Sequence, residues 1–443
     1  MSNAENPSLS AALSVAAVAP LQLSWTEGAV PHQALWRSES GAALPKRTVV
    51  ADDTMGADAA YRLACEGTAL LWRGDFQNAR QLLQAMARRA DRPSSKSKKA
   101  KAAEGKTSTV VPSEAFNLHR QAQSQRARTL ATLLIPLAAD YSIPLRRAPD
   151  WRQACSEAYA ELDTAPVHSV VSLRELLGVV GAHEWRKKGV EITALGAGLC
   201  PSSLSCPSGS NRIHPYYGVF SPVRGEYLSL VASMPLPAVG LSAAGLAADG
   251  SAFKGTVFDI GTGTGVLAAV LARRGVSRIV ATDQDPRALA CARDNLSRLG
   301  CASQVEVVDA DLFPPLHRYG PACLIVCNPP WLPARPSSRV EHAVYDPESR
   351  MLRGFLSGLA AHLVPDGEGW LILSDLAEHL GLRSREALLH WVASAGLVVL
   401  GRADVRPQHP KAMDASDPLH AARSAEVTSL WRLGVKPVPS LAS

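Results

Sequence analysis

Four residues at 328–331 leave a hydrophobic run in an unusual way. The apolar stretch "ACLIVC", which reads as a buried strand, is followed by Asn328, Pro329, Pro330 and Trp331. Two consecutive prolines end a strand, because they supply no N–H to a ladder and fix their own φ. The chain therefore leaves the expected sheet along a rigid path, with a polar amide at the exit and a large aromatic ring beyond it. An amide oxygen accepts hydrogen bonds and an aromatic face stacks on flat groups, so this exit is a candidate binding site.

A second candidate site is a glycine-rich turn between a buried strand and a helix, within "VFDIGTGTGVLAAVLARRG". Its glycines let the backbone turn tightly and approach a ligand closely. The spacing is GxGxG and not the GxGxxG of dinucleotide phosphate binding. Asp259, two residues before the first glycine, would repel a pyrophosphate, but it could accept hydrogen bonds from an ammonium group or hold the loop. The candidate ligand-binding residues of the loop are Gly261, Thr262, Gly263, Thr264 and Gly265.

Acidic residues follow the next two expected strands. Asp283 ends "RIVATD" and stands about 20 residues past the glycines, where an acid can chelate a ribose diol. Asp311 and Leu312 follow "QVEVVD" and fall near an adenine position. Together with the glycine loop they describe a nucleoside site that makes no demand for phosphate, and S-adenosylmethionine is such a ligand. The alternative for Asp283 is a helix N-terminal cap, a role for which Asp285 competes.

In this order, "DIGTGTG", "TDQDPRAL", "DLF" and "NPPW" resemble the small-domain class I methyltransferases that modify planar nitrogens. The resemblance covers roughly 211–435, and residues 328–331 fill the family's (N/D)PP(Y/F/W) motif. It implies a Rossmann-like, seven-stranded α/β domain and an enzyme that uses S-adenosylmethionine as its cofactor. It also implies that 328–331 are catalytic and that Asn328 lies beside the cofactor.

The chemistry gives a reason for these four residue types. An amide or exocyclic NH2 group is a poor nucleophile, because its lone pair is delocalised. The Asn328 side-chain oxygen and the Pro329 carbonyl can each accept one of its N–H groups, which aims the nitrogen at a sulfonium methyl. Trp331 can stack on the flat amide or base. No general base is required before transfer, since the proton can leave afterwards.

Several methyl acceptors remain open. The segment "YYGVFSPVRGEYLSLV", with Arg224, Glu226 and Tyr227, and the later Asp346 and Pro347 are similar to segments of protein glutamine methyltransferases that act on peptide-chain release factors. The same "GVFS" resembles ribosomal RNA guanine-N2 methyltransferases, and DNA adenine methylation is a weaker option without a target-recognition module. A glutamine side chain of a protein is the preferred acceptor. An RNA base, a small amine and a non-catalytic cofactor-binding module are the alternatives.

Hydrophobic periodicity and residue composition along the chain predict five segments. They also predict an α/β fold with a mostly helical N-terminal region. We expect amphipathic helices within 58–90, 114–141, 150–163 and 170–189, and an antiparallel strand pair near the C-terminal end. The expected segments are a poorly ordered leader at 1–48, a helical segment at 49–92, a basic flexible linker at 93–112, a helical domain with a boundary loop at 113–210, and the methyltransferase domain at 211–435.

Composition narrows the class of protein. No apolar run reaches the roughly 18–20 residues of a membrane helix, and the Ala-rich start has no basic residues ahead of it, so we expect a cytoplasmic protein without a membrane partner. Cys200 and Cys206 have no histidine at ligand spacing, so we expect no metal. Net charge is +6, much of it at 87–108, which reads as a solvated linker or as an arm that touches RNA.

Overall fold

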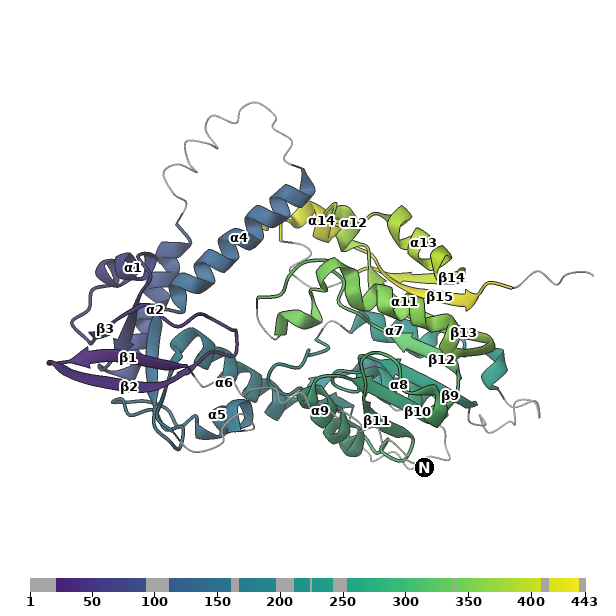
Figure 1. The fold of residues 1–443 in the computed structure, drawn as a ribbon, viewed down its shortest axis with the longest axis horizontal. Helices are drawn as coiled ribbons and strands as arrows, with labels where there is room; N and C mark the ends of the chain where they lie inside the picture. The colour runs from purple at the N-terminus through teal and green to yellow at the C-terminus, as the bar shows by residue number, and fades with distance from the viewer. Residues whose placement is uncertain are drawn as a thin grey trace, which may run out of the picture.

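The structure is a computed structural model that describes residues 21–92, 111–160, 167–196, 211–223, 225–241, 253–337, 340–407 and 414–437. Within these residues the chain forms two large β-sheets, each with its own helices, that lie side by side (Figure 1). The N-terminal half builds a six-stranded sheet and the C-terminal half a seven-stranded one. Among the described residues, no helix is long and apolar enough to cross a membrane.

The N-terminal sheet has the strand order β1-β2-β6-β5-β4-β3 and mixes parallel with antiparallel pairs. Its central strands are buried along their whole length, and Trp72, Phe76 and Met86 are among the fully buried side chains beside them. The strands are β1 (Gln22–Glu27), β2 (Val30–Arg37), β3 (Arg47–Ala51), β4 (Thr68–Trp72), β5 (Leu133–Leu137) and β6 (Ser169–Ser172). The helices are α1 (Ala57–Cys65), α2 (Phe76–Ala90), α4 (Pro112–Leu130), α5 (Arg152–Tyr159) and α6 (Leu173–Lys188).

The expectation of a mostly helical N-terminal region was wrong. Helices form in all four expected places, but "TALLW", "LLIPL" and "SVVS" are buried strands between or beside them. A short apolar run that is buried on both faces has no alternation, so periodicity cannot distinguish it from a buried helix turn. Much of the expected leader is also ordered, because residues 22–37 form the hairpin of β1 and β2. The expected linker lies largely outside the described residues, and α4 begins at its end.

The C-terminal sheet has the order β11-β10-β9-β12-β13-β15-β14, in which β15 is antiparallel to both neighbours and the other pairs are parallel. Its strands are β9 (Phe253–Ile260), β10 (Val276–Asp283), β11 (Val305–Asp309), β12 (Ala322–Cys327), β13 (Leu363–Ser374), β14 (Leu397–Val405) and β15 (Thr428–Val435). Its helices are α7 (Glu226–Ser233), α8 (Val266–Arg273), α9 (Pro286–Arg298), α10 (Leu316–Tyr319), α11 (Arg350–His362), α12 (Leu376–His379), α13 (Arg385–Ser394) and α14 (His420–Ala425). A small pair, β7 (Val190–Glu191) with β8 (Arg212–Ile213), lies between the two halves of the sequence.

The predicted Rossmann-like sheet is confirmed. All five expected parallel strands form, as do the expected helices after the glycine loop and after Asp283. The expected antiparallel pair is present too, although the short helix α14 separates its strands and β15 lies inside the sheet. The chain runs outward from β9 to β10 and β11 and then returns to β12 on the other side of β9. Such a reversal opens a crevice at the carboxyl ends of the strands, where ligands bind.

The N-terminal and C-terminal halves contact each other in several places. Helix α4 reaches from the first sheet to α12 and α14 (Figure 1), and its Phe116 is buried in a cluster with residues of the second half. Elsewhere, Arg287 at the start of α9 donates to a Glu39 carboxylate oxygen at 3.0 Å and to the Ala158 carbonyl at 2.9 Å. The two halves are therefore held together at α4 and again at the start of α9.

Candidate active site

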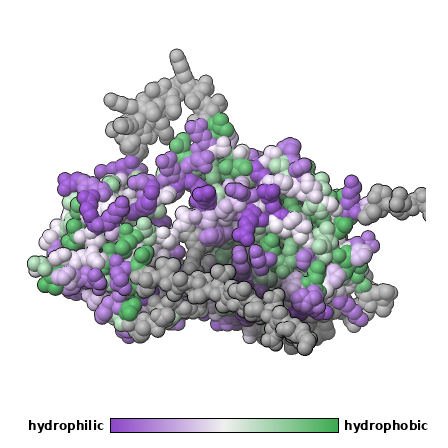
Figure 2. Space-filling view, viewed as in Figure 1, coloured by the Kyte–Doolittle hydropathy of each residue, from purple (hydrophilic) through white to green (hydrophobic). Residues whose placement is uncertain are grey.

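A cavity of about 2320 Å³ lies between the two halves and includes the crevice at β9, β10 and β12. Figure 2 shows the molecule hollowed between its two halves. One wall carries the glycine loop and residues 328–331, and the other carries residues of α4 and of the β2–β3 connection. The cavity is large enough for a nucleoside ligand together with part of a second molecule.

The glycine loop has the backbone conformation that its sequence predicts. Gly261, Gly263 and Gly265 have φ values of +71°, +56° and +80°, a region that residues with a Cβ rarely adopt. A Cβ on Gly261 would collide with the Met351 side chain, and one on Gly265 would lie 3.3 Å from Ala292 of α9. Gly261, Thr262, Gly263 and Thr264 line the cavity, whereas Gly265, also predicted to bind the ligand, does not line it and instead caps the start of α8. Glycine is therefore required here by conformation and by close packing.

Asp283 and Asp285 divide the two roles that the sequence left open. Asp285 caps α9, because its side chain accepts from the Arg287 N–H at 3.0 Å. Asp283 instead joins the strand end to the glycine loop: one oxygen accepts from the Gly263 N–H at 3.0 Å and the other from the Asp285 N–H at 3.0 Å. Each carboxylate oxygen keeps a further lone pair, and the side chain lines the cavity. Burial raises its pKa.

Asp311 and Leu312 also lie on the cavity wall, as expected of an adenine position. Leu312 has φ +70°, and its carbonyl accepts from the Thr282 hydroxyl at 2.6 Å, which ties the third strand exit to the second. Asp311 is exposed and lies 3.4 Å from Arg350. The exits of the first three strands thus form one continuous surface.

Asp259 lies behind that surface and contacts the glycine loop from inside the protein. It is fully buried and does not line the cavity. One carboxylate oxygen accepts from the Thr262 hydroxyl at 2.6 Å and from the Ala268 N–H at 3.1 Å. The other has no hydrogen-bond partner among the described residues. Of the two roles expected for this acid, holding the loop is the one these contacts support.

The Asp259→Asn variant should make stability less dependent on pH. Burial raises the pKa of Asp259 from 3.8 to about 6 in the folded protein. The stability that the protonated carboxyl contributes is complete below pH 3.8 and is lost as pH rises through about 6. Asparagine does not titrate, so the variant's free energy of unfolding relative to wild type should rise by up to about 3 kcal/mol between roughly pH 4 and 7. Urea unfolding of both proteins at several pH values measures this, and a difference that does not change with pH would contradict it.

The chain leaves β12 at Asn328, which lines the same cavity as the glycine loop, together with the three residues that follow it. Trp331 does not stand apart from the amide: its indole N–H donates to the Asn328 side-chain oxygen at 2.9 Å. That oxygen has a second lone pair, which stays available for an acceptor N–H. The indole thus orients the side chain predicted to be catalytic, a role that the sequence argument did not anticipate.

Tyr227 of α7 is a further site residue that sequence reasoning missed. It is buried, lines the cavity and lies near the Asn328 side chain. Burial and the nearby Asp259 charge raise the pKa of Tyr227, and the neighbouring Asn328 side chain opposes that rise. The available signal was the position of Tyr227 inside the "GVFSPVRGEY" segment; Arg224 lies outside the described residues.

Asp346 and Pro347 have a structural explanation. The buried Asp346 carboxylate accepts from the Met351 N–H at 2.9 Å and from the Leu352 N–H at 3.2 Å, so it anchors the start of α11. Its backbone N–H donates to the Leu332 carbonyl at 2.9 Å. The acid-Pro segment therefore fixes the end of the loop that begins just after Trp331.

A seven-stranded sheet with one inserted antiparallel strand, a glycine loop after its first strand and a carboxylate after its second form a Rossmann-like domain whose crevice can hold a nucleoside ligand such as S-adenosylmethionine. Residues 243–384 match the family model described as the methyltransferase small domain. The tight turn at the glycines and the free lone pairs of Asp283 fit this ligand.

Relatives carry two different names. A release factor glutamine methyltransferase from Cereibacter sphaeroides is 34% identical over 185 residues, which are 38% of this chain and 59% of the relative. A ribosomal protein L11 methyltransferase from Pelotomaculum thermopropionicum is 47% identical over 73 residues, 16% of this chain and 23% of the relative. A solved ribosomal protein L11 methylase from Lactobacillus delbrueckii subsp. bulgaricus is 16% identical, with a TM-score of 0.31, covering 49% of this chain and 83% of that one. The chain thus spans less than two thirds of the length of either curated relative.

Proposed function

We propose that this protein transfers a methyl group from S-adenosylmethionine to a planar nitrogen, and that the acceptor is a side-chain amide of a protein. The observation that carries the proposal is the position of Asn328 and Pro329 on the cavity that also contains the glycine loop and Asp283. Hydrogen-bond acceptors for an NH2 group and a site for the methyl donor therefore share one enclosed space.

The proposed reaction is a direct displacement in which the chain's residues orient the acceptor. S-adenosylmethionine supplies the methyl group on a sulfonium, so the acceptor nitrogen gains the N–C bond as the C–S bond breaks. The free lone pair of the Asn328 oxygen accepts one acceptor N–H, and the Pro329 carbonyl accepts the other. These bonds strengthen as the nitrogen loses its planarity, so they stabilise the transition state more than the ground state. The excess proton leaves to water after transfer.

A protein glutamine is favoured over other planar nitrogens because relatives named release factor glutamine methyltransferase are 34–37% identical to this chain over 119–185 residues. A relative named for ribosomal protein L11 matches as well, which also favours a protein acceptor. The alternative that the acceptor is an RNA base depends largely on the basic stretch at 87–108, most of which lies outside the described residues. The hydrogen bond by which Trp331 orients the Asn328 side chain disfavours a module that only binds cofactor.

The acceptor is tested with the full chain and methyl-labelled S-adenosylmethionine. Purified release factor, ribosomal protein L11 and ribosomal RNA are incubated separately, and label is located by peptide mass spectrometry or nucleoside analysis. We expect label on a glutamine side chain of the release factor. Label on L11 alone would mean that the acceptor is still a protein but a different one. Label on RNA alone, or on none of the three, would overturn the proposal.

A further inference from the structure

The loop that follows Trp331 is closed at its base. We call residues 332–337 and 340–345 the acceptor loop. Leu332 and Tyr345 form a parallel bridge, and the Leu332 N–H donates to the Val344 carbonyl at 3.1 Å. Because Leu332 directly follows Trp331, any movement of this loop acts on the residues that surround Asn328.

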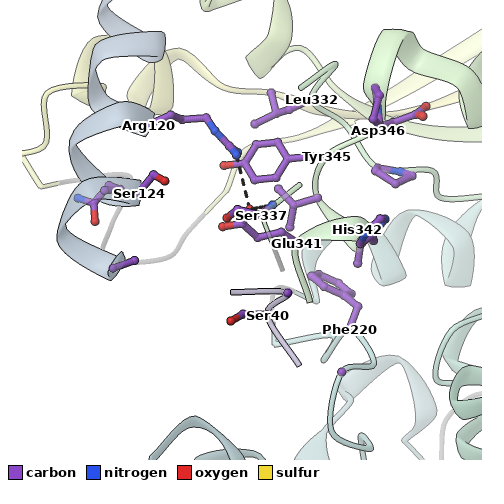
Figure 3. Close-up of a pocket in the computed structure, with 18 of the residues that line it drawn as sticks. Ser40, Arg120, Ser124, Phe220, Leu332, Ser337, Glu341, His342, Tyr345 and Asp346 are labelled. Atoms are coloured by element: carbon purple, nitrogen blue, oxygen red, sulfur yellow. Dashed lines mark hydrogen bonds and ion pairs between the residues drawn. The ribbon is translucent and has the colours of Figure 1, made fainter. Parts of the chain in front are cut away.

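One side chain from the other half of the molecule holds this loop. Arg120 of α4 donates to the Arg335 carbonyl at 2.8 Å and lies 3.5 Å from a Glu341 carboxylate oxygen. Its guanidinium carbon lies 3.8 Å from the centre of the Tyr345 ring. Figure 3 shows Arg120 reaching from α4 to Tyr345, with Glu341 and Ser337 beneath it. A single residue therefore contacts the beginning, middle and end of the acceptor loop.

The partners of Arg120 are themselves ordered within the loop. The Glu341 carboxylate oxygen near Arg120 also accepts from the Ser337 N–H and from the Ser337 hydroxyl, each at 2.7 Å. One helical turn before Arg120, Phe116 is 3% exposed and packs in a buried cluster that contains Leu332. Helix α4 thus contacts the loop in two ways: Phe116 packs in one cluster with Leu332 at the base of the loop, and Arg120 makes polar contacts further along it.

An arginine suits this place better than a lysine. Its planar group can stack on an aromatic ring while its edge donates to a carbonyl and a carboxylate. A lysine keeps the charge but presents a single ammonium, which cannot satisfy the ring, the carbonyl and the carboxylate in the same geometry. In this structure the plane of the guanidinium faces the Tyr345 ring while Nη2 makes both polar contacts, and Nη1 is buried with no hydrogen-bond partner among the described residues.

We propose that Arg120 is a positioning residue for the acceptor: it fixes the acceptor loop against α4, so that the N-terminal domain forms one wall of the acceptor pocket. The expected change in KM for the acceptor rests on the proposed function. The expected loss of loop order does not. Arg120 contacts neither the glycine loop nor Asp283 in the described structure, so its effect should fall on the acceptor and not on the methyl donor.

The test compares Arg120→Ala with Arg126→Ala in the full chain. Arg126 lies on the same helix, pairs with Asp91 at 2.6 Å and does not line the cavity, so it is a matched control. We expect Arg120→Ala to raise the KM for the acceptor about tenfold or more and to leave the Kd for S-adenosylmethionine within about twofold. Arg126→Ala should change neither, and Arg120→Lys should recover only part of the loss.

Hydrogen exchange provides a readout that does not need turnover. The backbone amides of Leu332, Tyr345 and Asp346 should exchange at least tenfold faster in Arg120→Ala than in wild type or Arg126→Ala. Unchanged exchange at these amides, or equal losses of acceptor and cofactor binding, would overturn the inference. If wild type methylates no acceptor, the proposed function fails while the exchange rates still decide the role of Arg120.

Discussion

Replacing Asn328 with alanine is expected to lower kcat for methyl transfer on the order of 10²- to 10³-fold, with cofactor affinity within about twofold of wild type. The magnitude follows from removing one preorganised hydrogen-bonding group that acts on charge developing in the transition state. Cofactor affinity should persist, because the glycine loop and Asp283 are held by their own contacts, and Asn328 is not among them. Single-turnover transfer and calorimetry with S-adenosylmethionine measure the two quantities.

Trp331→Phe tests the same site with a smaller change than Asn328→Ala. Phenylalanine keeps an aromatic ring but has no N–H to donate to the Asn328 oxygen. The variant loses this orienting hydrogen bond but keeps the Asn328 amide itself, so the fall in kcat should be smaller than for Asn328→Ala. A rate for Asn328→Ala equal to wild type would remove this residue from the chemistry.

Replacing Asp283 with alanine is expected to weaken S-adenosylmethionine binding about 10- to 150-fold. The carboxylate offers charge-assisted hydrogen bonds to a ribose diol, a contribution of roughly 1.5–3 kcal/mol. It also orders the glycine loop by accepting the Gly263 N–H at 3.0 Å. Isothermal titration calorimetry of the variant and the wild-type protein measures the loss.

Asp285→Ala is the matched control for that experiment. Asp285 is two residues away and also lines the cavity, but its side chain caps α9. Its replacement should lower the free energy of unfolding by about 1 kcal/mol and leave cofactor affinity nearly unchanged. Equal losses of affinity in the two variants would reduce Asp283 to a structural residue and contradict its assignment to the ribose.

The C-terminal domain was predictable because its signals are local. Each parallel strand is a run of apolar residues followed by a loop residue with an evident task, and the glycines of the loop adopt the left-handed backbone that their spacing requires. The N-terminal sheet was missed because strands such as "LLIPL" are short and wholly buried. Such strands are recognised only by their neighbours, which lie far away in the sequence.

The same distinction explains the site. That Asn328, Asp283, Gly261 and Gly263 lie at one cavity could be predicted from the sequence, since each follows a strand and the strand ends meet at one edge. Tyr227 touches a residue about 100 positions away, and Arg120 touches the acceptor loop more than 200 positions away. No periodicity or spacing predicts contacts between elements whose packing is set by the whole fold. The indole bond to Asn328 is local, but the sequence permits several Trp331 orientations and the surrounding packing selects this one.

The central claim is that Asn328 faces the reacting carbon of a methyl donor bound at the glycine loop. The most direct measurement is a crystal structure of the full chain with S-adenosylhomocysteine, the demethylated product. We expect its ribose hydroxyls on the Asp283 carboxylate and its sulfur directed toward the Asn328 side-chain oxygen. A product bound away from the glycine loop, or a sulfur turned from Asn328, would contradict the account.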